Sequence, residues 1–216
     1  MRYRPVVVED ARQIVAAGYD VIAQEYLDWS ARIQDDPRSR FVDLLLARLS
    51  PGSEILELGC GAGVPCTAKL AQRHRVFGVD LSAKQVELAR LAVPGARFAQ
   101  ADMTDLDVPP ASLDAVTAFY SILHVPRAEQ PALYARIASW LRPGGLFLAA
   151  LGASGNNGVD ADWLGAPMFF SSHPPARNSV LLRQAGLRLL VDEPVTMHEP
   201  EGPATFHWVL ATPAGR

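Results

Sequence analysis

The chain has 216 residues, of which 49% are hydrophobic and 20% charged, and its formal net charge at pH 7 is −3. This composition is ordinary for a globular protein, and the length suits one domain with a large core. The slightly acidic charge and the lack of a lysine and arginine run exclude a surface built to neutralise many phosphates, so we expect a small-molecule partner and no nucleic acid.

The N-terminal segment "MRYRPVVVEDARQ" has too short an apolar run for a signal peptide, and no apolar run approaches the roughly 18 residues of a membrane span. The two cysteines are Cys60, inside a glycine loop, and Cys66, just after it. A disulfide there would distort a backbone already committed to a turn. We therefore expect a cytoplasmic protein without a membrane partner. Its oligomeric state is left open.

The spacing of apolar residues predicts two helices between residues 9 and 48, with a break at Pro37. From Glu54 the period changes to that of strands separated by helical stretches. The expected strands cover 54–58, 75–80, 96–102, 113–119 and 146–151, and the expected helices cover 64–73, 82–92 and 128–141. This alternation predicts an α/β fold with a doubly wound, mostly parallel sheet and helices on both faces.

The last third of the chain departs from this alternation. Residues 152–178 are rich in Gly, Asn and Pro but carry an aromatic load unusual for a linker, which indicates an ordered insertion or lid. A helix is expected from about Ala176 to Ala185, followed by the strand pair "LRLLVDEPV" and "TFHWVLAT". We therefore expect a single domain, 1–216, made of a helical cap (1–50), a core (51–151), the lid (152–178) and a closing helix and strand pair (179–216).

The segment "ILELGCGAGVPC", residues 55–66, places a glycine loop at the end of the first expected strand. In a doubly wound sheet, such a loop lets backbone N–H groups and a helix N-terminus approach a ligand closely. A dinucleotide fingerprint would need glycine at position 64, which is Val64 here. Asp80 closes the next strand, where its carboxylate can accept hydrogen bonds from both hydroxyls of a ribose. The ligand is therefore expected to contain an unphosphorylated ribose.

Two further features narrow the ligand. Glu57, beside the glycine turn, would repel a pyrophosphate but suits the ammonium group of an amino acid. The third strand ends in Asp102 and Met103, which offer an acceptor for an adenine amino group and an apolar face for the ring. Ribose, adenine and a cationic amino-acid group together describe S-adenosylmethionine.

The segments "ILELGCGAG", "VFGVDLS", "FAQADMTDL", "LDAVTAFYSILHV" and "LRPGGLFLAAL" resemble, in order and spacing, the successive motifs of class I S-adenosylmethionine-dependent methyltransferases. The resemblance covers about residues 53–151. It implies a Rossmann-like sheet of seven strands ordered 3-2-1-4-5-7-6, with strand 7 antiparallel. It also implies that the cofactor contacts lie within these motifs, at Gly59, Cys60, Gly61, Asp80, Leu81, Asp102, Met103 and Phe119.

The segment "GYDVIAQEYLDW" resembles the N-terminal helix that, in many small-molecule members, lays a tyrosine over the cofactor. The resemblance gives this role to Tyr26, with Tyr19 nearby. Both tyrosines lie on the apolar stripe of the expected helix, so core packing is the alternative. A tyrosine face beside a sulfonium gains roughly 0.5 to 2 kcal/mol by cation–π attraction.

Methyl transfer from a sulfonium is an in-line displacement, which requires alignment and exclusion of water but no metal. His124 is the candidate base for a hydroxyl acceptor, because an imidazole can take a proton at neutral pH. The alternative is that His124 only packs or shapes the pocket. The other histidines lack metal-ligand spacing, so no metal is expected.

The acceptor is expected to contact Tyr19, Tyr120 and His124. The lid residues Trp163, Met168, Phe169 and Phe170 are expected to form a wall of its pocket or, alternatively, a satellite hydrophobic cluster. The sequence thus predicts a methyltransferase that acts on oxygen or nitrogen of a small, aromatic or partly apolar acceptor. The alternatives are a nicotinamide-dependent oxidoreductase, disfavoured by Val64 and Glu57, and a non-catalytic, cofactor-binding regulatory module.

Overall fold

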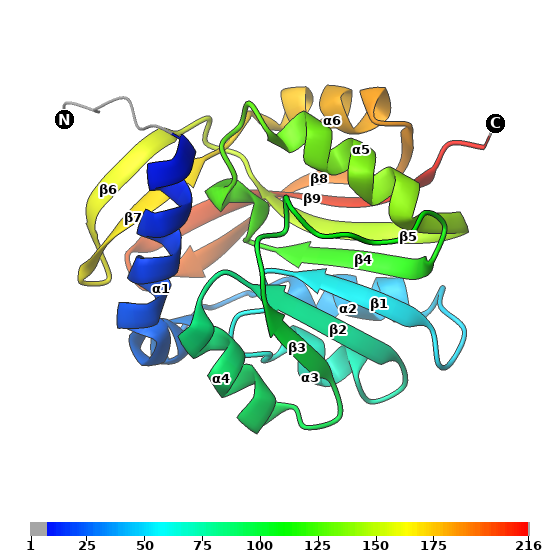
Figure 1. Ribbon diagram of the computed structural model, residues 1–216. Helices are drawn as coiled ribbons and strands as arrows, with labels where there is room; N and C mark the ends of the chain where they lie inside the picture. Colours follow the sequence, from blue (N-terminus) through cyan, green and yellow to red (C-terminus); the bar gives the residue numbers. More distant parts are fainter. Residues whose placement is uncertain (1–7, 216) are drawn as a thin grey trace.

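Seven strands form one mixed sheet in the computed structural model, which describes residues 8–215 (Figure 1). The strand order is β3-β2-β1-β4-β5-β9-β8, and β9 runs antiparallel to both of its neighbours. The strands are β1 (Glu54–Leu58), β2 (Arg75–Asp80), β3 (Arg97–Gln100), β4 (Leu113–Phe119), β5 (Leu141–Gly152), β8 (Leu187–Glu199) and β9 (Gly202–Pro213). The predicted order is therefore confirmed, with β8 and β9 as the sixth and seventh strands of the sheet.

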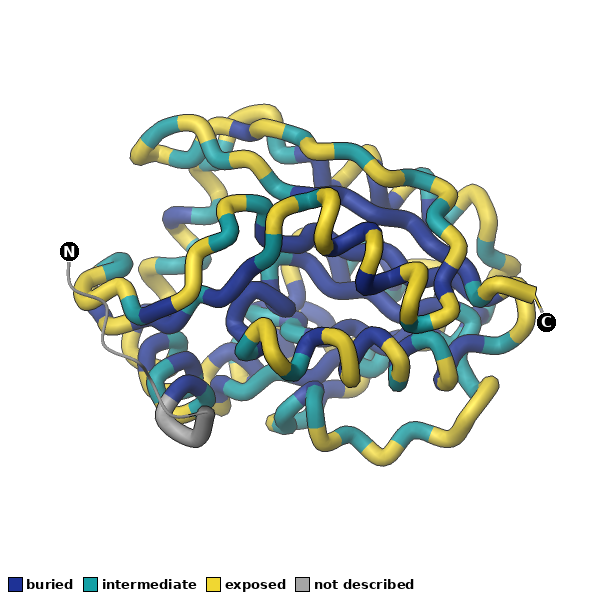
Figure 2. The backbone as a smooth tube through the Cα atoms, turned by 90° about the horizontal axis from the view of Figure 1, so that it is seen from above, coloured by how far each residue is buried: buried dark blue, intermediate teal, exposed yellow. Residues whose placement is uncertain are grey.

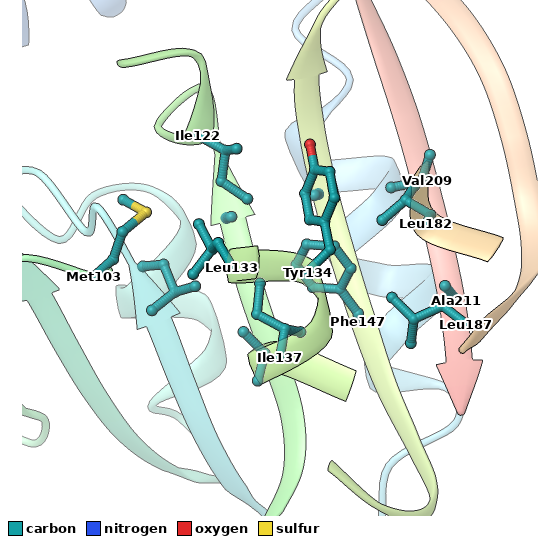
Figure 3. Packing of buried hydrophobic residues seen from close by; sticks show 14 of the residues in the cluster. Met103, Ile122, Leu133, Tyr134, Ile137, Phe147, Leu182, Leu187, Val209 and Ala211 are labelled. Atoms are coloured by element: carbon teal, nitrogen blue, oxygen red, sulfur yellow. The ribbon is translucent and has the colours of Figure 1, made fainter. Parts of the chain in front are cut away.

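Helices cover both faces of this sheet because its strands are apolar on both sides. Alternate residues of β5 point to opposite faces: Phe147 packs toward α5 (Gln130–Trp140) and α6 (Pro175–Gln184), whereas Leu148 packs toward α2 (Arg38–Leu46) and α3 (Cys66–Leu70). Figure 3 shows residues of α5 lying over the strands on the first face. In Figure 2 the buried backbone forms the centre of the molecule.

The helix α4 (Ala83–Ala92) packs on β2 and β3 and contacts α3 through small side chains. Ser82 caps its first turn by accepting a hydrogen bond from the Gln85 N–H. The helix expected at 64–73 is shorter in the structure, because Val64 precedes a proline, a position that disfavours helical backbone, and residues 71–73 form a turn into β2.

Residues 157–171 form a two-stranded antiparallel hairpin of β6 (Asn157–Trp163) and β7 (Ala166–Ser171). Leu164 and Gly165 connect the strands with positive φ angles of 52° and 91°, as a tight two-residue turn requires. The long helix α1 (Val8–Ser30) lies beside this hairpin (Figure 1). At Gly18 the two approach so closely that a Cβ atom would lie 2.8 Å from the Pro167 carbonyl oxygen.

The helix α1 and the hairpin form a cluster of their own, separate from the two main cores. They contact the short 3-10 helix η1 (Ile122–His124), which follows β4. Helix α1 and the hairpin thus cover the region where the parallel strands end. Within the described residues, no helix is both long and apolar enough to span a membrane.

Candidate active site

A cavity lies beneath α1 at the carboxyl ends of β1, β2 and β4. We call it the glycine-loop cavity. Most of the predicted cofactor and acceptor residues line it: Tyr19, Tyr26, Glu57, Gly59, Cys60, Gly61, Asp80, Leu81, Met103, Phe119, Tyr120 and His124. The structure therefore brings together residues from α1, from three strand ends and from η1, as expected for a ligand site in a doubly wound sheet.

The glycine loop is held in a shape that only glycine permits. Gly59 has a φ of +71°, and a Cβ atom there would lie 2.2 Å from the Cβ of Ser121. The Gly61 N–H donates to Asp80 Oδ2 at 2.9 Å, and the Ser82 N–H donates to Asp80 Oδ1 at 3.0 Å. Asp80 thus fixes the loop and the start of α4 together. Burial raises the pKa of its carboxyl group, while these backbone hydrogen bonds oppose the rise.

Glu57 is a buried carboxyl group at one end of this cavity, only 2% exposed. The Thr67 hydroxyl donates to its Oε2 atom at 2.5 Å. Burial raises the pKa of Glu57 to about 7, although the Thr67 hydrogen bond and the charge of Arg38 lower it. A cationic group bound nearby would favour the ionised form.

Sequence reasoning missed Arg38, which lines the same cavity and is 8% exposed. Asp36 holds it, since Arg38 Nε and Nη2 donate to Asp36 Oδ2 at 2.7 Å and 2.6 Å. Arg38 follows Pro37, which separates the two N-terminal helices. A charged residue at the start of a helix gives no signal of burial, so only the structure places this cation beside Glu57.

Sequence reasoning also missed Gln85 as a residue of this site. Its side chain is 1% exposed and lines the glycine-loop cavity, where a Cβ atom on Gly61 would lie 3.7 Å from Gln85 Oε1. Neither amide atom has a hydrogen-bond partner among the residues that the structure describes. Its position on α4 beside the buried Val86 was the available signal, because a polar residue on an inward helix face needs a partner.

Tyr19 and His124 form a hydrogen-bonded pair between α1 and η1. Tyr19 Oη lies 2.9 Å from His124 Nε2, and His124 Nδ1 lies 2.7 Å from the Phe169 carbonyl oxygen. Because a carbonyl only accepts, Nδ1 carries the imidazole proton and Nε2 accepts the proton of Tyr19. Burial lowers the pKa of His124 to about 4, so the ring is neutral at pH 7.

A second cavity, of about 400 Å³, lies on the other side of this pair between α1, the hairpin and the ends of β8 and β9. We call it the aromatic cavity. It shares five lining residues with the glycine-loop cavity: Tyr19, Tyr26, Arg38, Tyr120 and His124. Further aromatic walls come from Trp29, Trp163, Phe170 and Phe206. Tyr120 adopts a φ of +56°, a backbone strain often found at functional sites.

Three predicted contact residues do not line either cavity. The Asp102 carboxylate forms an ion pair with Arg12 of α1 and accepts from the Thr104 hydroxyl at 2.7 Å. Met168 and Phe169 are buried in the cluster that the hairpin forms with α1, at 0% and 4% exposure. Phe169 instead contributes its carbonyl group to His124, and Phe170 faces the aromatic cavity.

The comparisons with known proteins agree with this architecture. Residues 55–145 match the family model of a methyltransferase domain. This match and the strand order agree with the predicted resemblance to the class I S-adenosylmethionine-dependent methyltransferases.

The curated relatives match this chain over only part of their own length. Phosphoethanolamine N-methyltransferase 3 of Arabidopsis thaliana is 34% identical over 114 residues, which cover 50% of this chain and 22% of that protein. Trans-aconitate 2-methyltransferase of Paracidovorax citrulli is 37% identical over 128 residues, covering 55% and 48%. The chain thus spans less than half the length of either relative.

Among solved structures, the chain is similar to 1,6-didemethyltoxoflavin-N1-methyltransferase of Burkholderia thailandensis, crystallised with 1,6-didemethyltoxoflavin and S-adenosylhomocysteine. The TM-score is 0.75 at 19% identity, covering 100% of this chain and 94% of the other. At this identity the likeness supports the fold alone.

Proposed function

We propose that this chain transfers the methyl group of S-adenosylmethionine to oxygen or nitrogen of a small, aromatic or partly apolar acceptor. The observation that carries the proposal is that two cavities, one lined by the glycine loop and one by aromatic side chains, adjoin at Tyr19 and His124. In-line transfer needs a donor site and an acceptor site that meet at one place.

The residues of the glycine-loop cavity fit the proposed cofactor in charge and hydrogen bonding. The amino-acid group of the cofactor carries both an ammonium and a carboxylate. Glu57 supplies a buried negative charge for the ammonium, and Arg38 supplies a buried positive charge for the carboxylate. Asp80 provides a carboxylate for ribose hydroxyls, and the unpartnered Gln85 amide provides a donor and an acceptor. When bound, the cofactor supplies an electrophilic methyl group on a sulfonium.

The Tyr19 and His124 pair orients the acceptor. The Tyr19 hydroxyl donates to His124 Nε2, so its oxygen lone pairs are free to accept a hydrogen bond from the hydroxyl or amine of an acceptor. This contact aims the nucleophilic lone pair of the acceptor. Because its pKa is about 4, His124 is a weak base, and a proton moves toward it through Tyr19 only as the acceptor becomes acidic during transfer.

Tyr19→Phe and His124→Ala variants test this assignment. Each is expected to keep S-adenosylhomocysteine affinity within a few-fold and to lower turnover by about 10²-fold, the contribution typical of a positioned proton acceptor. The double variant is expected to lose no more than the worse single variant, because both changes break one hydrogen-bonded unit. Calorimetry and transfer of labelled methyl to a panel of phenols and aromatic amines measure the two quantities.

Titration with NADH provides the control for the oxidoreductase alternative. Tight NADH binding without S-adenosylhomocysteine binding would refute the proposed function, as would cofactor binding without methyl transfer across the panel. Additive losses in the double variant would remove the pair from the mechanism while leaving the cofactor site in place.

A further inference from the structure

The lining of the aromatic cavity contains more carboxylates than lysine and arginine side chains. Among residues 8–215, two carboxylates, Asp160 and Glu199, line the cavity, and Arg38 is the only lysine or arginine of that lining. The guanidinium of Arg38 is paired with Asp36, and the proposed function assigns its remaining side to the carboxylate of the cofactor, so it adds no net positive charge for an acceptor. His124 adds no charge at neutral pH. The described part of the lining therefore presents negative charge without an unpaired cation.

Glu199 is the carboxylate that is partly withdrawn from water. Across residues 8–215, no hydrogen bond or ion pair satisfies its side chain, although it is only half-buried and solvent reaches part of it. Burial and the neighbouring charge of Glu201 raise its pKa. Glu201 itself is engaged, since Trp29 Nε1 donates to it at 2.9 Å. A partly desolvated carboxylate beside a cavity is stabilised by a cation that enters it.

The aromatic side chains next to Glu199 are arranged to hold such a cation and a flat ring. Trp29 stacks on Tyr26 with ring centroids 5.9 Å apart, and Trp163 meets Tyr26 at 5.7 Å and Phe170 at 5.5 Å. Aromatic faces attract cationic amines as well as planar rings. The volume of about 400 Å³ lies within the range of small-molecule pockets and accommodates a bicyclic ring with a short side chain.

Building on the proposed function, we propose that the acceptor is an aromatic amine of one kind, a compound whose aromatic ring carries an alkylamine that is protonated at neutral pH. Its ammonium group lies against Glu199 and the tryptophans, and its nucleophilic atom reaches Tyr19. Anionic acceptors are excluded by charge. The chain therefore differs from the two curated relatives named above, since phosphoethanolamine carries a phosphate and aconitate carries carboxylates, and either would need a free cation, which the lining between residues 8 and 215 does not offer.

Three indoles that differ mainly in charge test this proposal: tryptamine, 3-methylindole and indole-3-propionate. Each is titrated by calorimetry into the full chain saturated with S-adenosylhomocysteine. We expect tryptamine to bind at least tenfold more tightly than indole-3-propionate, with 3-methylindole between them. In Glu199→Gln, the advantage of tryptamine over 3-methylindole is expected to fall to within about threefold.

Glu193→Gln is the matched control, because Glu193 lies on the same strand, outside the cavity lining, and pairs with Arg40 at 2.7 Å. It is expected to leave all three affinities within twofold. Thermal unfolding checks that both variants fold.

The failure of this inference is distinguishable from that of the proposed function. If indole-3-propionate binds as tightly as tryptamine, or if none of the three binds to the S-adenosylhomocysteine complex, the assignment of an aromatic amine is overturned while the cofactor site stands. If the wild-type chain does not bind S-adenosylhomocysteine at all, the proposed function itself fails. An equal loss of tryptamine affinity in both variants also contradicts a specific role for Glu199.

Discussion

Glu57 shows how one residue can report on the ligand. In the free chain its pKa is about 7, since burial outweighs the Thr67 hydrogen bond and the attraction of Arg38. An ammonium group bound beside it favours the ionised carboxylate and lowers this pKa. Cofactor binding should then release a proton from Glu57 wherever the free chain still holds one.

We therefore expect S-adenosylhomocysteine binding to release a fraction of a proton at pH 6 to 7 and little at pH 8.5, where Glu57 is already ionised. Calorimetry in phosphate and in Tris measures the release, because the two buffers differ in ionisation enthalpy. Glu57→Gln should bind more weakly and without this release. The same release in the variant would show that the proton comes from another group.

Gln85 is the second residue whose state depends on a ligand. Leaving a buried polar group without a partner costs roughly 1 to 3 kcal/mol, so Gln85→Leu should raise the free energy of unfolding of the cofactor-free chain. If the amide binds the cofactor, the same change should weaken S-adenosylhomocysteine binding by about tenfold. Urea unfolding and calorimetry measure the two effects.

Tyr134→Phe is the control, since Tyr134 on α5 also has a buried hydroxyl without a described partner but lies outside the glycine-loop cavity (Figure 3). It should leave cofactor affinity unchanged. If Gln85→Leu bound S-adenosylhomocysteine with wild-type affinity, the Gln85 amide would have no role in cofactor binding.

At the scale of elements, the sequence predicted the positions of the parallel strands because buried strands carry nearly continuous apolar runs with clear breaks, whereas the strand order was predicted from the resemblance to a known family. It did not predict the hairpin of β6 and β7, whose strands mix apolar residues with Gly, Asn and Asp and turn at Leu164 rather than at a typical turn pair. The pairing places Phe169 and Phe170 on opposite faces of the hairpin, so only Phe170 of these two side chains lines the aromatic cavity. A list of aromatic residues in a segment cannot show which face each occupies.

The candidate site was predictable where residues stand in local motifs, as at Asp80 and the glycine loop. Arg38 and the Arg12 contacts depend on where α1 and α2 pack, which no local pattern specifies. Contacts with the cofactor and the acceptor stay predictions for all of these residues, as does the division of the chain into cap, core and lid.

Two ion pairs of Arg12 hold helix α1 over the site. Arg12 pairs with Asp102 and, at 2.6 Å, with Glu129. These charge-assisted bonds are partly shielded from water and link α1 to the loops after β3 and η1. Arg12→Ala is expected to raise amide hydrogen exchange in α1 and to speed S-adenosylhomocysteine dissociation, each by about tenfold.

Arg32→Ala is the control for this change, because Arg32 follows α1 and makes only an exposed pair with Glu25 at 3.9 Å. It should leave both rates unchanged. Unaltered exchange in Arg12→Ala would mean that α1 is held by its apolar contacts with the hairpin alone.

At the scale of the whole molecule, two buried groups of the site act on stability in opposite directions as the pH changes. The folded chain lowers the pKa of His124 from 6.5 to about 4, so the unfolded chain binds more protons between these values and acidification destabilises the fold. The folded chain raises the pKa of Glu57 from 4.5 to about 7, so acidification across that window stabilises the fold. The windows overlap between pH 4.5 and 6.5, where the two effects oppose each other.

A variant that lacks one of the two groups should show the effect of the other group on the pH dependence of stability. Between pH 7 and pH 5, His124→Asn should gain about 2 kcal/mol of unfolding free energy relative to the wild-type change, and Glu57→Gln should lose about as much, because one pKa unit corresponds to about 1.4 kcal/mol. Urea unfolding at the two pH values measures these differences, and the remaining titratable groups are common to all three proteins and cancel. Variants that follow the wild-type profile would show that these groups are not held in their buried states, and with that the charge argument for the cofactor end of the site would fail.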